Sequence, residues 1–139
     1  MSARFFVDTN ILLYAHEPDA GLKHERALKL VQGLWANREG AVSTQVLQEF
    51  AFNLYRKTRL SLSLYDVGLR VTLYSRWELV VNTPASILRA LAIQESNAIS
   101  FWDSLILQAA EFCRAEIVYS EDLAHGARYG TVQVVNPLI

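Results

Sequence analysis

Residues 4–15 read Arg4-Phe5-Phe6-Val7-Asp8-Thr9-Asn10-Ile11-Leu12-Leu13-Tyr14-Ala15. The first four residues are typical of a short buried strand, and residues 10–17 are typical of a helix that stops near Pro18. An acidic residue, Asp8, therefore follows a strand and precedes a helix. This order indicates an α/β domain, in which ligands bind at the carboxyl ends of parallel strands.

Working outward, short apolar segments recur at residues 40–43, 79–81, 117–119 and 132–135. Helical periodicity between them predicts helices at residues 22–36, 44–57, 84–97 and 101–115. A further helix is expected to end near Trp77, after an extended lead from Leu60 to Leu64. Short apolar strands separated by helices indicate a buried parallel sheet. We therefore predict a three-layer α/β/α domain with a mostly parallel central sheet, spanning residues 1–139 as a single domain.

Three helices carry apolar stripes that we expect to face the core. Their members are Leu28, Val31 and Trp35; Val46, Phe50 and Leu54; and Leu105, Ala109 and Phe112. Composition agrees with a globular chain, because 52% of the 139 residues are hydrophobic and 19% are charged. No apolar run is long enough for a membrane span, and the polar residues after Val7 exclude a signal peptide. A cytoplasmic protein with a buried, unreactive Cys113 is the expectation.

Four acidic residues are placed where they could share one cleft. Asp8 and Asp122 follow predicted strands, Asp103 lies at the start of a helix, and Glu49 lies within the helix at 44–57. Carboxylates that share a cleft raise each other's pKa unless a cation joins them. Oxygen ligands of this kind suit Mg²⁺ or Mn²⁺, which activate water and hold a phosphodiester. The pattern indicates a candidate acidic cleft, whose chemistry would suit a metal-dependent enzyme that cleaves phosphodiesters.

Helix capping explains the same acidic residues without any chemistry. Asp8 would cap the helix after it, and Ser100 with Asp103 forms a capping box. Asp122 would lie in the first turn of a helix, where negative charge is favourable. Periodicity alone places Glu49 on the solvated side of its helix. The residues by themselves leave both interpretations open.

Four segments resemble the motifs of PIN domains, in particular those of VapC-type toxins. They are Phe6-Val7-Asp8-Thr9-Asn10-Ile11-Leu12-Leu13-Tyr14-Ala15, Ser43-Thr44-Gln45-Val46-Leu47-Gln48-Glu49-Phe50, Ser100-Phe101-Trp102-Asp103-Ser104-Leu105-Ile106 and Tyr119-Ser120-Glu121-Asp122-Leu123, followed by Val135-Asn136-Pro137. They occur in the order of the family and cover nearly the whole chain. Together they favour a metal site over capping.

The resemblance implies an endoribonuclease that uses Mg²⁺ or Mn²⁺ and leaves a 5′-phosphate. It implies that the catalytic metal ligands, direct or through water, are Asp8, Glu49, Asp103 and Asp122. Thr9, Asn10 and Ser120 would orient these carboxylates, whereas Glu121 is expected to be solvated. The implied partners are RNA, a second copy of the chain in a homodimer, and an antitoxin that blocks the cleft.

Basic and aromatic residues supply candidate RNA contacts. Arg56, Lys57 and Arg59 form the densest basic run, and Lys23, Arg26 and Lys29 form another; a solvated helix face is the alternative for both. Trp102 could stack on a base, or it could pack in the core or an interface. His16, His24 and His125 share no metal-ligand spacing and are expected to make local hydrogen bonds. Net charge is −1, but outside the four acidic site residues ten acids face 13 bases.

Three other functions are alternatives to a metal-dependent nuclease. A haloacid-dehalogenase-type phosphatase requires a second Asp two positions after the first, where this chain has Asn10. A receiver domain requires an Asp at the end of the third strand, where the sequence is Asn82-Thr83-Pro84. A non-catalytic PIN domain that only binds RNA or protein remains the alternative, and metal-dependent RNA cleavage distinguishes it from the enzyme.

Overall fold

The structure, a computed structural model, describes residues 4–58 and 61–139. Within them the strands are β1 (Phe5–Val7), β2 (Gly40–Ser43), β3 (Glu78–Val80), β4 (Ile117–Tyr119), β5 (Arg128–Tyr129) and β6 (Val132–Val135). The helices are α1 (Thr9–Ala15), η1 (Pro18–Ala20, a 3-10 turn), α2 (Leu22–Asn37), α3 (Thr44–Thr58), α4 (Leu64–Tyr74), α5 (Pro84–Ser96) and α6 (Phe101–Phe112). Arg59 and Leu60, for which an RNA contact and an extended lead were predicted, lie outside the described residues.

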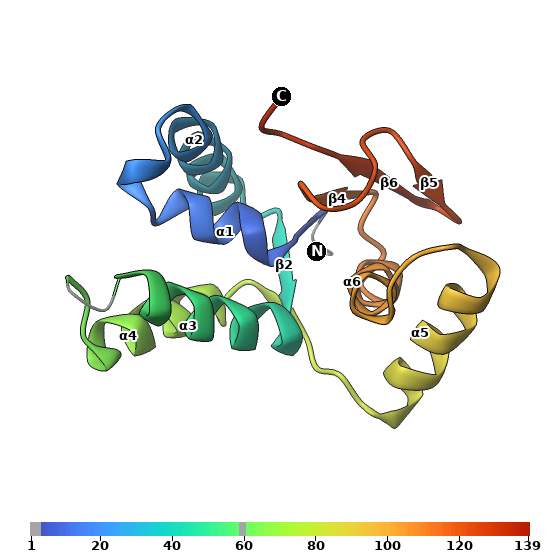
Figure 1. Cartoon of the computed structure of the whole chain (residues 1–139). Helices are drawn as coiled ribbons and strands as arrows, with labels where there is room; N and C mark the ends of the chain where they lie inside the picture. Colours follow the sequence, from blue (N-terminus) through green and yellow to red (C-terminus); the bar gives the residue numbers. More distant parts are fainter. Residues whose placement is uncertain (1–3, 59–60) are drawn as a thin grey trace.

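The strands form one sheet in the order β3-β2-β1-β4-β6-β5. Every neighbouring pair is parallel except β5 with β6. Helices α1 to α4 pack against one another, as do α5 and α6, and Figure 1 shows β1 and β2 between these two groups. The predicted α/β/α fold with a mostly parallel sheet is confirmed.

Differences from the predicted elements are concentrated near the C-terminus. The two-residue strand β5, which pairs antiparallel with β6 through a turn at Gly130 (φ 59°), is too short to produce a sequence pattern. The helix expected to begin near Asp122 is absent from the described residues, where bends follow β4 instead. The predicted helix at 101–115 ends at Phe112, and the one expected to reach Trp77 ends at Tyr74.

The core confirms one predicted stripe fully and corrects two. Val46, Phe50 and Leu54 are completely buried along α3. On α2 the buried stripe is Ala27, Val31 and Leu34, so Leu28 and Trp35 lie to its side. On α6, Phe112 is 76% exposed, because the helix buries only residues 104–110 between the sheet and α5. Within the described residues, no helix is long and apolar enough to cross a membrane.

One glycine is required by close packing at the start of β2. A Cβ atom built on Gly40 would lie 2.6 Å from the Trp77 ring. Trp77 is buried and packs edge-on against Trp35 and Tyr74. The absence of a side chain at position 40 therefore allows this aromatic cluster to close one edge of the sheet.

The topology fixes where a ligand site can form. From β1 the chain adds β2 and then β3 on one side, whereas β4 and β6 lie on the other side of β1. The order therefore reverses between β1 and β4, and open α/β sheets bind ligands at the carboxyl ends of strands at such a point. Asp8 and Ser120 follow these two strands directly, since Val7 is paired with Tyr119.

Candidate active site

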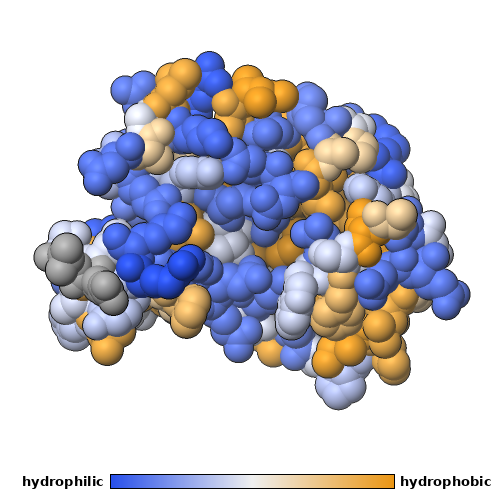
Figure 2. All heavy atoms as spheres, in the orientation of Figure 1, coloured by the Kyte–Doolittle hydropathy of each residue, from blue (hydrophilic) through white to orange (hydrophobic). Residues whose placement is uncertain are grey.

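A hollow of about 280 Å³ lies at this point of the sheet. Its lining comes from the start of α1, from α3, from the start of α6 and from the loop after β4. The lining residues are Asp8, Thr9, Asn10, Leu13, Gln45, Glu49, Asn53, Arg56, Lys57, Trp102, Asp103, Ile106 and Asp122. All four acidic residues singled out from the sequence therefore line one hollow. Figure 2 shows hydrophilic side chains gathered over the middle of the face drawn in Figure 1.

Asp8 is the buried member of the acidic set. Its side chain is 5% exposed. Oδ1 accepts a hydrogen bond from the Thr9 backbone N–H (2.7 Å), and Oδ2 accepts one from the Ser120 hydroxyl (2.8 Å). Burial raises the pKa of Asp8 to about 7; the two hydrogen bonds oppose that rise, and the charges of Asp122 and Glu49 add to it. The site thus holds a carboxylate whose ionised form a nearby cation would stabilise.

Glu49 is half-buried and faces α1, contrary to the solvated position that helical periodicity predicts. The Thr9 hydroxyl donates a hydrogen bond of 2.7 Å to Glu49 Oε1. The periodicity argument fails here because α1 packs across α3 and covers part of its polar side. Thr9 therefore contacts two of the acidic residues, Asp8 through its backbone and Glu49 through its side chain.

Asp103 both belongs to a helix cap and lines the hollow. The Ser100 hydroxyl accepts a hydrogen bond from the Asp103 backbone N–H (3.0 Å), as the capping pattern predicts. Burial raises the pKa of the Asp103 carboxyl, hydrogen bonding to Ser100 opposes the rise, and the charge of Asp122 adds to it. Capping and a role in the cleft are therefore compatible for this residue.

Asp122 is exposed and lies in a bend, so the predicted favourable position at a helix start is wrong. Its backbone N–H donates to the Ser120 hydroxyl (3.1 Å), the same group that donates to Asp8. Ser120 is completely buried. It thereby connects the loop that carries Asp122 to the carboxylate of Asp8.

The four carboxylates share the hollow without being drawn together. In the described part of the chain, no group of three or more His, Cys, Asp or Glu side chains is close enough to hold a metal ion. The four negatively charged side chains lie around the hollow, apart from one another. The chemistry of the donor set fits Mg²⁺ or Mn²⁺, since both prefer oxygen ligands and Mg²⁺ retains several waters.

Asn10 and Glu121 connect α1 to the loop after β4. Asn10 Oδ1 accepts a hydrogen bond from the Glu121 backbone N–H (3.3 Å). Glu121, expected to be solvated, is instead half-buried; it accepts hydrogen bonds from the Tyr14 hydroxyl (2.8 Å) and Lys23 Nζ (2.6 Å). Because both of its carboxylate oxygens are engaged and it does not line the hollow, its role is structural.

The predicted basic residues differ in their surroundings. Arg56 and Lys57 line the hollow. Arg56 donates a hydrogen bond to Asn53 (2.9 Å), and Lys57 pairs with Glu17 (3.2 Å). Lys23 and Arg26, from the second basic set, instead contact Glu121 and the Leu138 carbonyl. Positive charge therefore borders the acidic residues along α3.

Two lining residues were missed or misjudged from the sequence. Gln45, 5% exposed, donates a hydrogen bond to the Trp102 carbonyl (3.2 Å) and so connects α3 to α6. It precedes Glu49 by four residues, so the helical repeat could have identified it. Trp102 is 62% exposed, so packing in the core is wrong for this residue.

The histidines and the cysteine lie outside the hollow. His16 contacts Tyr74 and Arg70, His24 contacts the Tyr14 carbonyl, and His125 accepts a hydrogen bond from the backbone of Asn136, so the expected local hydrogen bonds are confirmed. Cys113 is buried, and burial raises the pKa of its thiol to about 11, which makes it a poor nucleophile.

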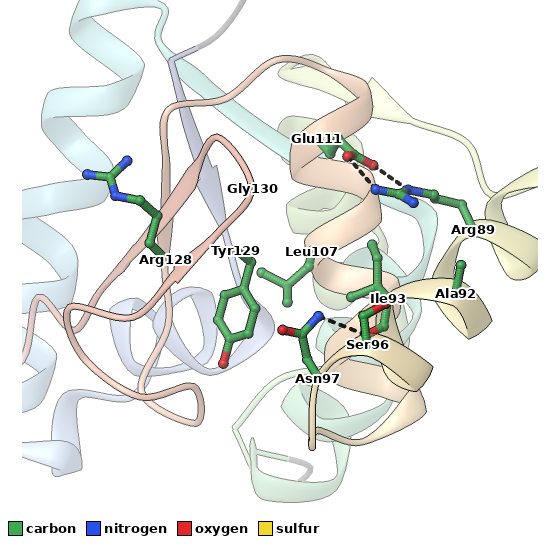
Figure 3. A pocket seen from close by; sticks show the side chains of 10 residues that line it. All are labelled: Arg89, Ala92, Ile93, Ser96, Asn97, Leu107, Glu111, Arg128, Tyr129 and Gly130. Atoms are coloured by element: carbon green, nitrogen blue, oxygen red, sulfur yellow. Dashed lines mark hydrogen bonds and ion pairs between the residues drawn. The ribbon is translucent and has the colours of Figure 1, made fainter.

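A second hollow, of about 160 Å³, lies between α5, α6 and the β5 hairpin (Figure 3). Its principal charges neutralise each other, because Arg89 donates two hydrogen bonds of 2.8 Å to Glu111. Arg128 points away from that pair in Figure 3. This hollow has none of the carboxylate grouping found at the strand ends.

The chain belongs to the PIN domain family, whose model matches residues 5–127. Among solved structures it is similar to VapC20 of Mycobacterium tuberculosis, described as a toxin that cleaves the sarcin-ricin loop. The two share 22% sequence identity with a TM-score of 0.62, over 85% of this chain and 89% of the other. At this identity the likeness establishes the fold. No curated protein matches the sequence.

Proposed function

We propose that this PIN domain is a metal-dependent endoribonuclease that acts as the toxin of a toxin–antitoxin pair. One observation carries the proposal: Asp8, Glu49, Asp103 and Asp122, from four separate segments of the chain, line a single hollow. The raised pKa of buried Asp8 supports it, because the fold places a carboxylate where its charge lacks compensation.

The four carboxylates would hold Mg²⁺ or Mn²⁺, directly or through water. When bound, such an ion supplies an activated water and offsets the charge of the phosphodiester. Thr9 and Ser120 orient Glu49 and Asp8 through the hydrogen bonds that their hydroxyls donate. Asn10 holds the loop that precedes Asp122 against α1.

RNA would enter along the basic side of the hollow. Arg56 and Lys57 lie on α3 beside Glu49, where their charges can hold the phosphates that flank the cleavage position. Arg59 extends the same basic run in the sequence. Binding would combine these local contacts with the cation in the cleft, because the whole chain carries a formal charge of only −1.

The partners proposed here follow from the family and from the likeness to VapC20. A cognate antitoxin would inhibit the enzyme by covering the acidic hollow, and two copies of the chain would form a homodimer. Large apolar side chains are exposed along α4 and α5, among them Leu64, Tyr65, Ile87, Leu88 and Leu91. Exposed apolar surface of this kind supports association with protein partners.

A second candidate function is a non-catalytic PIN domain that binds RNA or protein. The observation that favours it is the separation of the acidic side chains, since no three of the described His, Cys, Asp and Glu residues form a ready metal site. If a cation binds and draws the carboxylates together, the site becomes that of the proposed enzyme.

Cleavage of a structured RNA distinguishes the two candidates. The wild type, Asp103→Asn and the matched control Asp19→Asn, an exposed acid on η1, would each be incubated with a ribosomal RNA fragment and Mn²⁺. The nuclease proposal expects discrete products bearing 5′-phosphates from the wild type and the control, and at least a hundredfold slower cleavage by Asp103→Asn. Equal products from all three proteins, or products that persist in EDTA, would contradict it.

A further inference from the structure

We propose that Trp102 is the base-stacking residue of the acidic hollow, its indole ring packing against a nucleobase next to the phosphate held there. The inference rests on the proposed function, because it requires single-stranded RNA in the hollow. It assigns a substrate-positioning role to a side chain that is not one of the acidic residues.

The ring is exposed at the rim of the hollow. Trp102 is 62% exposed and lines the same space as the four carboxylates. Its one ring contact within the described residues is with Phe101, at a centroid distance of 5.3 Å and an interplanar angle of 76°. Such an edge-on contact covers at most one face of the indole, so the other face is available to a ligand.

The backbone beneath the ring is fixed. The Trp102 carbonyl accepts the hydrogen bond from buried Gln45 on α3, and the cap at Ser100 closes the first turn of α6. The indole is therefore carried by a backbone held from two helices, and its position relative to neighbouring Asp103 is restricted. A stacking surface held in place before binding loses less conformational entropy when the ligand arrives.

The surroundings match the way proteins bind single-stranded nucleic acid. Such sites combine cations that follow the phosphates with aromatic side chains on which bases stack. Arg56 and Lys57 supply the cations on α3, and Trp102 is the one aromatic residue that lines the hollow within the described residues. Because every base has a π face, the stacking would tolerate many sequences.

The binding test uses two fluorescently labelled probes with Ca²⁺ in place of Mn²⁺, which keeps a cation among the carboxylates of the hollow, and each sample is checked afterwards for uncut probe. One probe is an octamer of adenosine, and the other is an octamer of abasic ribose phosphate. The proteins are the wild type, Trp102→Ala, Trp102→Phe, and Phe112→Ala as the control, which removes another exposed aromatic ring from the far end of α6.

We expect Trp102→Ala to weaken binding of the adenosine octamer by about 5-fold to 150-fold. Trp102→Phe should retain most of the affinity, and Phe112→Ala should bind as the wild type does. Binding of the abasic octamer should be the same for all four proteins. Undiminished binding of the adenosine octamer by Trp102→Ala, or an equal loss for both octamers, would overturn the proposal. The proposal is also overturned if light scattering gives Trp102→Ala a different mass from the wild type while its RNA affinity is unchanged, because Trp102 would then contact a protein.

Cleavage in Mn²⁺, measured on the same proteins, separates this inference from the proposed function. If the wild type binds the adenosine octamer through Trp102 but does not cut RNA, the nuclease proposal fails and the stacking role stands. If the wild type cuts RNA and Trp102→Ala binds and cuts equally well, the stacking role alone fails.

Discussion

Replacing Asp8 by Asn tests whether the fold holds an uncompensated carboxylate. Asp8 is 5% exposed, and its pKa is about 7 instead of 3.8, chiefly because of burial. In EDTA at pH 8 the folded protein must keep this group ionised against its surroundings. Asn has nearly the same shape and can accept from the Thr9 N–H, but it loses the hydrogen bond with Ser120, whose hydroxyl oxygen already accepts from the Asp122 and Leu123 N–H groups.

The expected magnitude follows from the difference in pKa between the folded and unfolded states. A folded-state pKa of about 7 against 3.8 lowers the free energy of unfolding, relative to its value at low pH, by about 4 kcal/mol at pH 8 and by about 2 kcal/mol at pH 5. The pKa of this carboxyl is raised on folding, so the stability contribution of the protonated group is present below pH 3.8, is lost as pH rises from about 4 to about 7, and changes little above that. Allowing about 1 kcal/mol for weaker hydrogen bonds, Asp8→Asn should be more stable by about 3 kcal/mol at pH 8 and about 1 kcal/mol at pH 5.

Urea unfolding in EDTA at both pH values measures these differences. Asp19→Asn serves as the control, because the exposed acid on η1 should change stability by less than about 0.5 kcal/mol at either pH. An Asp8→Asn protein that is less stable than the wild type at pH 8, or equally affected at both pH values, would refute the account of Asp8.

Three further results are expected. Ser120→Ala removes the hydroxyl that donates a hydrogen bond to Asp8, and it should weaken Mn²⁺ binding by about 10-fold to 100-fold in calorimetry. An unchanged affinity would contradict a role of Ser120 in orienting Asp8. Gly40→Ala should destabilise the fold by about 1–3 kcal/mol in urea, because its Cβ would meet the Trp77 ring at 2.6 Å, whereas the open position of Gly68 on α4 should tolerate Ala. Burial lowers the pKa of His16 to about 4, so the wild type should lose about 2 kcal/mol relative to His16→Gln as pH falls from 6.5 to 4; a constant difference would contradict that assignment.

The fold was largely predictable because its signals are local. Apolar segments of strand length and the cap at Ser100 mark their elements directly, and the cap hydrogen bond from the Asp103 N–H is present. The predictions were wrong where contacts between distant segments determine the structure. The β5 strand exists only through pairing with β6, and the exposure of Phe112 depends on how far α5 covers α6.

The site was less predictable from the residues, because its members come from four segments. Helical periodicity placed Glu49 in solvent, because the periodicity of α3 contains no information about how α1 packs across it. The hydrogen bond from Thr9 to Glu49 depends on that packing. The exposure of Trp102 was equally inaccessible, because an aromatic residue in an apolar helix is usually buried. Resemblance to a family supplied what local patterns could not, namely that the four acids belong together.

Thermal unfolding with and without Mn²⁺, on the wild type and on Asp103→Asn, tests the acidic metal site most directly. At a hundred times its dissociation constant, Mn²⁺ should stabilise the wild type by about 2.7 kcal/mol, or roughly 5–10 °C in Tm. Asp103→Asn should lose most of that rise and be no less stable than the wild type in EDTA. No effect of Mn²⁺ on the wild type, together with a loss of about 0.3–1 kcal/mol in Asp103→Asn, would show that the acid only caps its helix.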